Sequence, residues 1–329
     1  MISSILKFVF AGAIILWLFY SGKLDFSLFV KTFKSGNGPY FAILFYIFAV
    51  VLSSYRWKII LEAKTIDPLP FKKILPINWI GLFFSTFLPG VVTGDVVKLL
   101  YIKDLHKNFS KTYLLTSIFI DRIIGLCGLL FLTGFISIIK YEALTSLSPE
   151  IKTLVHFNFF LFAGSMGFIV GLFLPLEVKN FFYSLLIRVP KIGERLKSTL
   201  EQAWLIGQFK LATLKCLFIS ILAQLLGITA IWLLTKPFYP SPVSLDLILG
   251  VVPIGLITVA IPISPSGAGV GHLIFEKIFN LIGVPNGASL FNIHFLVLIL
   301  VNLFGVIPYI LFGKKHSIDE AEKFEEETS

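Results

Sequence analysis

Helix-breaking and charged residues interrupt the apolar run FFSTFLPGVVTGDVVKLL at residues 83–100. A broken helix in lipid leaves backbone amide and carbonyl groups without partners, so it persists only where protein or a water-filled cavity surrounds it. Such breaks commonly form binding sites, and the positive end of a helix that restarts after a break suits an anion. The residues that we assign to this candidate substrate-binding site are Pro89, Gly90, Gly94, Asp95 and Lys98.

Prolines and glycines interrupt a second apolar run, 245–282, in the same way. If half-helices start after Pro89–Gly90 and after Ser266–Gly267, each would direct N–H groups of its first turn toward a bound anion. The alternative is that these residues merely kink two ordinary helices. The candidate site residues of the second run are Ser264, Pro265, Gly267 and Gly269.

Arg122 lies about nine residues inside the apolar run 113–139, roughly 13 Å deep at 1.5 Å per residue. An unpaired charge at that depth would cost several kcal/mol, so Arg122 needs a partner. Its neighbour Asp121 points about 100° away on a helix, so we expect each residue to pair with a different element. The candidate partners are Asp95, Lys98 and Arg56. The cations could bind a lipid phosphate, but a salt-bridge network that only holds the fold explains them equally well.

His272 and Glu276 lie four residues apart, so they share one face of a helix, and either could titrate as protons cross the membrane. The spacing is also half of a metal site, but no third ligand is evident, so we expect neither a metal nor a cofactor. Local pairing or exposure at the membrane interface is the preferred interpretation of both residues. We interpret three polar residues of the last span as interhelical hydrogen-bonding groups, and they are Asn292, His294 and Asn302.

The elements that position these residues belong to a membrane protein. The chain has 329 residues, of which 56% are hydrophobic and 14% charged, so its solvent is mostly hydrocarbon. Its net charge of +9 lies mainly in short loops beside apolar runs, which favours contact with anionic lipid over nucleic acid. Cys127 and Cys216 fall within apolar runs and indicate neither a disulfide nor a metal site.

Hydropathy predicts an all-α polytopic integral membrane protein with about six full spans and two broken, re-entrant hairpins. The predicted spans are 5–20, 40–54, 113–139, 157–176, 214–234 and 288–312. Three connections are basic: the one with Arg56 and Lys58, the one with Lys98 and Lys107, and 188–215. These connections and both termini should face the cytoplasm. The two hairpins would then enter from opposite faces, the pattern of an inverted repeat with a site near the midplane.

Two further segments lie outside the predicted spans. Ile192, Leu196, Leu200 and Trp204 follow one another at four-residue steps, which predicts an amphipathic helix over 191–208 at the membrane surface. The acidic tail 314–329 is expected to be cytoplasmic, solvated and disordered.

Four short motifs follow one another along the chain. They are Arg56–Trp57, LPGVVTGD at 88–95 with Lys98, DRIIGL at 121–126, and PISPSGAGV at 262–270. Together they resemble the lysylphosphatidylglycerol synthase transmembrane region, also called the flippase-like domain of multiple-peptide-resistance proteins. The resemblance covers nearly the whole chain and implies a flippase-like transmembrane domain at 1–313, equivalent to the membrane half of the two-part synthases only.

The chain departs from the pattern of that family at three places. Thr93 stands where glycine is common, and Lys98 stands where arginine is common. Gly271–His272 stands where many members have a basic residue and then glutamate. The last departure puts any glutamate-dependent step in doubt.

The resemblance implies a transporter-like protein of the plasma membrane, a flippase or translocator of an anionic phospholipid or a lipid-linked sugar phosphate. Its expected partners are these lipids and a separate synthase or transferase. Two alternatives stay open. One is a membrane-embedded lipid-headgroup transferase, with Asp95 or Asp121 as base, or the membrane partner of a synthase; the other is a non-catalytic envelope scaffold. The sequence has neither a P-loop nor a nucleophile elbow, and we assign no catalytic residue.

Overall fold

A computed structural model describes residues 16, 20, 27–65, 67–87, 93–186, 193–236, 243–259 and 269–312. Within these residues the regular elements are helices, and five stretches are long and apolar enough to cross a membrane. They are α3 (Gly38–Glu62), α6 (Lys111–Ile139), α8 (Pro149–Leu172), α11 (Lys210–Thr235), and α14 (Gly287–Leu303) with α15 (Val306–Leu311). The prediction of an all-α polytopic membrane protein is confirmed. The tail 314–329 and nearly all of the predicted span 5–20 lie outside the described residues.

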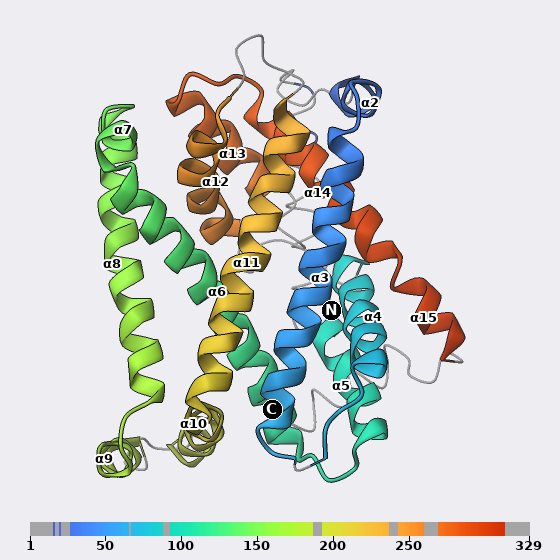
Figure 1. The fold of residues 1–329 in the computed structure, drawn as a ribbon, viewed down its shortest axis with the longest axis vertical. Coiled ribbons are helices and arrows are strands. Elements are labelled where there is room, and N and C mark those ends of the chain that lie inside the picture. The colour runs from blue at the N-terminus through green and yellow to red at the C-terminus, as the bar shows by residue number, and fades with distance from the viewer. Residues whose placement is uncertain are drawn as a thin grey trace.

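Two pairs of shorter helices form hairpins. α4 (Phe71–Phe87) and α5 (Thr93–Leu105) pack against each other at the end of the molecule where α3 ends and α6 begins (Figure 1), which we call the α5 end. α12 (Leu245–Val259) and α13 (Val270–Leu281) form the corresponding pair at the opposite end, which we call the α13 end. After each pair the chain resumes at the end where the preceding long helix stopped. The hairpins are therefore re-entrant from opposite ends, as predicted, and the interpretation as two kinked spans is wrong.

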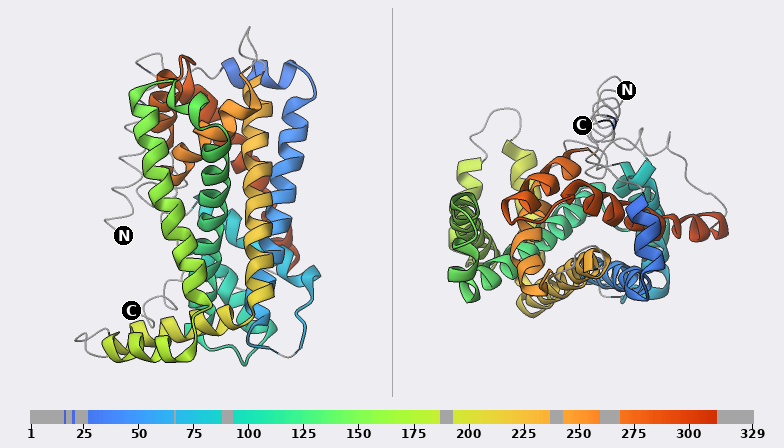
Figure 2. Two further views of the ribbon diagram at one scale, coloured as in Figure 1. Left: turned by 60° about the vertical axis from the view of Figure 1, so that its left-hand side comes forward. Right: turned by 90° about the horizontal axis from the view of Figure 1, so that it is seen from above.

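The order of long helix, hairpin and long helix occurs twice, in opposite directions. α3, the first hairpin and α6 form one unit, and α11, the second hairpin and α14 form the other. The two leading helices, α3 and α11, pack side by side along their length (Figures 1 and 2). This arrangement is that of an inverted repeat.

In the described part of the chain, four helices connect the two units. α7 (Tyr141–Thr145) follows α6 at the α13 end, and α8 returns along α6 to the α5 end (Figure 1). α9 (Leu176–Leu186) and α10 (Gly193–Gln208) then lie across that end of the bundle (Figure 2, left). The helix predicted over 191–208 is confirmed by α10. α2 (Ser27–Lys34), also among the described helices, precedes α3 at the α13 end (Figure 1).

Polar residues join the last span to other helices, as expected from the sequence. His294 Nδ1 lies 2.5 Å from the hydroxyl of Tyr46 on α3. Asn302 donates to Thr86 Oγ1 on α4 at 2.9 Å. Because lipid offers no hydrogen-bonding partners, such groups favour one particular packing of the helices.

The structure corrects the predicted end of the second span. α3 continues to Glu62, eight residues beyond Ser54, so Arg56 and Lys58 lie inside the helix and not in a basic connection. Lys98 likewise lies inside α5. Arg56 has buried polar partners on other helices, Asp121 and Ser220, so the helix continues through a charge that hydropathy alone treats as the end of a span.

Candidate functional site

The candidate site centres on Asp95, in the first turn of α5. Its Oδ1 lies 2.9 Å from Nζ of Lys98, one turn later on the same helix. Its Oδ2 accepts hydrogen bonds from Nε and Nη2 of Arg122 on α6, and Nε lies 2.7 Å away. Asp95 therefore bridges two cations and joins the first hairpin to the long helix that follows it.

Arg56 and Asp121 form a second ion pair in the same part of the bundle. Nε and Nη2 of Arg56 donate to the two carboxylate oxygens of Asp121 at 2.7 and 2.9 Å, which is a bidentate geometry. Nη1 of Arg56 donates to Ser220 Oγ at 2.9 Å. Gly125 leaves room for the guanidinium, because a Cβ at that position would lie 3.1 Å from Nη1. The pair joins α3 to α6 and α11.

Lys98 has aromatic and amide partners besides Asp95. Its Nζ lies 4.5 Å from the centre of the Trp57 ring, which is a cation–π contact. It also donates to Asn78 Oδ1 at 3.4 Å, and Asn78 donates to Ser54 Oγ at 2.9 Å. Ser54, Asn78 and Ser220 are not predicted as site residues from the sequence. The available signal was a polar residue within an apolar run, which does not say whether the residue faces a charge or a helix backbone.

Exposure distinguishes the three cations. The side chains of Arg56 and Lys98 are 9% and 7% exposed, whereas that of Arg122 is 47% exposed although it pairs with Asp95. Within the part of the chain that the structure describes, these three cations face two carboxylates, so the ion pairs carry one positive charge in excess. An accessible guanidinium with a neighbouring excess of positive charge can bind an oxyanion such as phosphate.

Gly269 and His272 of the second hairpin form a hydrogen-bonded cluster with Asn292 of α14. The N–H of Gly269, a residue with φ of +79°, donates to His272 Nδ1 at 3.2 Å. His272 Nε2 lies 3.3 Å from Asn292 Oδ1 on α14. Glu276 is engaged elsewhere, because its Oε2 accepts the N–H of Ala288 at 2.9 Å in the first turn of α14. Both residues thus pair with α14.

The structure groups some predicted site residues and separates others. Asp121 and Arg122 each pair with another element, as predicted. Gly94 directly precedes Asp95 and packs so closely on α4 that a Cβ would overlap Ser85 and the Gly81 carbonyl. The residues that come together around the ion pairs are Arg56, Gly94, Asp95, Lys98, Asp121 and Arg122. Those on the other hairpin are Gly269, His272 and Glu276, and those outside the described residues are Pro89, Gly90, Ser264, Pro265 and Gly267.

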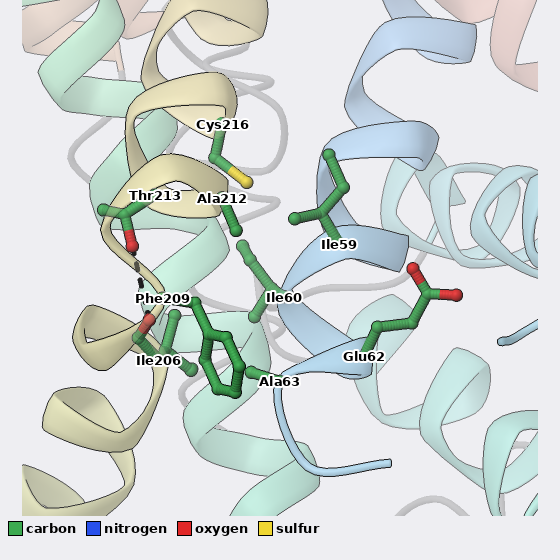
Figure 3. A pocket seen from close by; sticks show the side chains of 9 residues that line it. All are labelled: Ile59, Ile60, Glu62, Ala63, Ile206, Phe209, Ala212, Thr213 and Cys216. Carbon is green, nitrogen blue, oxygen red and sulfur yellow. Dashed lines mark hydrogen bonds between the residues drawn. The ribbon is translucent and has the colours of Figure 1, made fainter. Parts of the chain in front are cut away.

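A separate cavity of about 190 Å³ lies between the end of α3 and the start of α11 (Figure 3). Its walls are mostly apolar, and its lining residues are Ile59, Ile60, Glu62, Ala63, Ile206, Phe209, Ala212, Thr213 and Cys216. The polar groups in it have partners: Glu62 pairs with Lys58 at 2.6 Å, and Thr213 donates to the Ile206 carbonyl oxygen at 3.3 Å. The cavity adjoins the Arg56 backbone through Cys216, whose Sγ lies 3.7 Å from the Arg56 carbonyl oxygen. The ionic side chains of the candidate site do not line it.

Long apolar helices, two opposed re-entrant hairpins and an internal ion-pair cluster define a polytopic membrane protein. In the described part of the chain, no group of three His, Cys, Asp or Glu side chains could hold a metal ion. The chain belongs to the family of the lysylphosphatidylglycerol synthase TM region, which it matches over residues 4–313.

A more limited match connects the chain to an archaeal protein. Over 84 residues the chain is 32% identical to a UPF0104 membrane protein of Pyrococcus horikoshii, and this stretch is 25% of each chain. The match thus spans about a quarter of the relative's length. No solved structure matches the chain. Family membership and a membrane setting follow from these comparisons.

Proposed function

We propose that the protein binds the phosphate of an anionic lipid at Arg122 and moves that headgroup across the membrane. The lipid would be an anionic phospholipid or a lipid-linked sugar phosphate. The observation that carries the proposal is the exposure of Arg122, which lies eleven residues after Lys111 in a candidate span and has a side chain that is 47% exposed. Ionisable residues at such depth are rare and generally belong to substrate or ion paths.

The pairing of Asp95 would allow a bound anion to replace its carboxylate on Arg122. Lys98 and Arg122 contact different oxygens of this one carboxylate. A phosphate could therefore replace Asp95 on Arg122 while Asp95 stays paired with Lys98. Such an exchange leaves no buried charge without a partner, which avoids the main energetic cost of opening an ion pair inside a protein.

Side chains beside Arg122 suit an acyl chain. Phe119 and Leu126 lie three residues before and four residues after Arg122, so the three share one face of α6. Both apolar side chains are exposed. A lipid with its phosphate at Arg122 would lay hydrocarbon along this face.

The opposed hairpins support movement of the headgroup in addition to binding. Transporters built from inverted repeats carry their sites at broken helices and change access when one repeat rocks against the other. We place the α5 end in the cytoplasm, at the plasma membrane, because its connections are basic. A separate synthase or transferase that supplies the lipid is part of this proposal.

Lipid movement in reconstituted liposomes tests the proposal. The full chain would be reconstituted with fluorescent phosphatidylglycerol, and the wild type compared with Arg122→Gln and with Lys140→Gln. Lys140 is the matched control, because it pairs with Asp246 at 2.9 Å and lies at the far end of α6 from the site. Loss of a charge-assisted hydrogen bond should slow movement by about tenfold or more in Arg122→Gln and leave Lys140→Gln unchanged.

Two outcomes would contradict the proposal. If the wild type and a folded Arg122→Gln variant moved lipid at equal rates, Arg122 would not be part of the binding site. A folded wild type that moves no anionic lipid would refute translocation and favour a partner of a synthase or an envelope scaffold.

A further inference from the structure

A second cationic site lies on the helices that cross the α5 end. Lys179 on α9 is only 5% exposed, and its Nζ lies 5.5 Å from the centre of the Trp204 ring on α10. Figure 2 shows both helices across the end of the bundle, where α8 stops and α11 begins. The site is therefore separate from the ion pairs around Arg122 on α6.

Trp204 gives this site a fixed wall. Its Nε1 donates to the Gly171 carbonyl oxygen at the end of α8, at 2.9 Å. Tyr183 of α9 packs edge-on against it, with ring centroids 5.2 Å apart. The indole is buried and held from two sides, and the Lys179 ammonium group lies over it between α9 and α10.

The electrostatic surroundings of Lys179 are positive. Burial and the charge of Lys210 both lower the pKa of Lys179. Lys210 is the first residue of α11, a helix of 26 residues whose N-cap, Phe209, makes no side-chain capping bond. Glu201, on α10 one turn before Trp204, pairs with Lys197 at 3.5 Å. Among the described residues, no carboxylate pairs with Lys179.

We propose that Lys179, Lys210 and the first turn of α11 bind a phosphate group against the Trp204 wall. Two lysines and the positive dipole end of a helix N-terminus all favour an anion. A buried ammonium group that has no carboxylate partner is stabilised strongly by a bound anion. The phosphate belongs to an anionic lipid of the leaflet at the α5 end. Exposed apolar side chains nearby, Phe181, Phe209 and Leu211, would contact its acyl chains.

Native mass spectrometry of the full chain in detergent tests this site. Phosphatidylglycerol would be titrated into the wild type, Lys179→Gln, Lys210→Gln and the control Lys197→Gln, with phosphatidylcholine as the uncharged comparison. Each of the first two substitutions should weaken the tightest phosphatidylglycerol adduct by about fivefold, since a lysine near an anionic surface contributes about 1 kcal/mol. Lys197→Gln should bind as the wild type does, because that lysine pairs with Glu201.

Further arms separate the sources of the phosphate and the role of the charge. Displacement of the adduct by millimolar inorganic phosphate would support the anion site but overturn a lipid as its ligand. Lys179→Arg should retain the adduct; its loss there as well as in Lys179→Gln would show that charge does not hold the lipid. Equal affinities of the wild type and Lys179→Gln would overturn the site.

This site is independent of translocation through Arg122. The Arg122→Gln variant should retain the same tightly bound phosphatidylglycerol, although its lipid movement is slowed. Failure of one proposal thus leaves the other standing.

Discussion

Asp121 and Arg122 are sequence neighbours that bind different helices. Asp121 faces Arg56 of α3, and Arg122 faces Asp95 of α5. A rotation of about 100° between successive helical residues makes it impossible for both to point at one partner. The sequence therefore predicts two separate pairings but does not choose the partners. That choice depends on which helices lie on the two sides of α6.

Asp121→Asn tests how much the fold depends on the buried pair. The substitution leaves the Arg56 guanidinium buried without its carboxylate, which should lower the free energy of unfolding by about 3–5 kcal/mol. Thermal unfolding in detergent measures the loss. The double variant Arg56→Leu with Asp121→Leu should recover most of it, because two apolar side chains have no charge to desolvate. A single variant as stable as the wild type would contradict a structural role for the pair.

Glu276→Ala tests the contact between the second hairpin and the last span. The Glu276 carboxylate accepts the Ala288 N–H in the first turn of α14, which acts as a helix cap contributed by another helix. Its loss should weaken that turn by about 0.5–2 kcal/mol. Hydrogen exchange at Ala288 should become faster. Lys277→Ala changes an exposed neighbour on α13 and should leave that exchange rate as it is.

At the scale of elements, the first hairpin depends on close backbone contact. Gly94 of α5 lies against Gly81 and Ser85 of α4 with no room for a Cβ. Lys98, one turn after Gly94, thereby comes within reach of Asn78. The glycine in this motif is thus explained by helix packing within the hairpin, whether or not a ligand also approaches it.

Gly94→Ala should separate α4 from α5. An added methyl group in a tightly packed contact costs about 1–3 kcal/mol, and the displaced α5 would carry Asp95 and Lys98 away from their partners. Gly227→Ala is the control, because a Cβ at that helical position of α11 meets open space. Thermal unfolding and lipid movement should both decline in Gly94→Ala, and neither should decline in Gly227→Ala. Equal unfolding temperatures for the two variants would contradict the packing argument.

The bounds of the helices are predicted less well from the sequence than their existence. The hairpins, the amphipathic helix α10 and most spans follow from apolar length and from prolines and glycines. Hydropathy predicts the end of α3 too early, because the charge of Arg56 is typical of a loop residue. A charge ends a span only when it has no partner inside the protein, and partners come from distant helices.

At the scale of the whole molecule, the two units place their hairpins at opposite ends. The accessibility of single cysteines tests this topology once Cys127 and Cys216, both buried, are replaced by serine. Asn108→Cys lies in the loop between α5 and α6, and Ser146→Cys lies between α7 and α8. These two positions should react with a membrane-impermeant maleimide from opposite sides of sealed vesicles.

Lys236→Cys and Pro285→Cys complete that test. They precede and follow the second hairpin, and both should react from the same side as Ser146→Cys. If α12 and α13 crossed the membrane as one kinked span, the two positions would react from opposite sides. That result would contradict the inverted repeat.

The sequence by itself determined the membrane setting, the approximate spans, the two broken segments and the need of Asp121 and Arg122 for separate partners. Each follows from local properties: apolar length, the backbone chemistry of proline and glycine, and the cost of a charge in lipid. Only the tertiary structure decided that Asp95 pairs with both Lys98 and Arg122, and that Arg56 donates to Ser220 as well as to Asp121. It also decided that the Arg122 side chain stays half exposed. These facts depend on contacts between helices whose contacting residues lie up to 164 positions apart in the sequence. No local pattern encodes which helix faces meet.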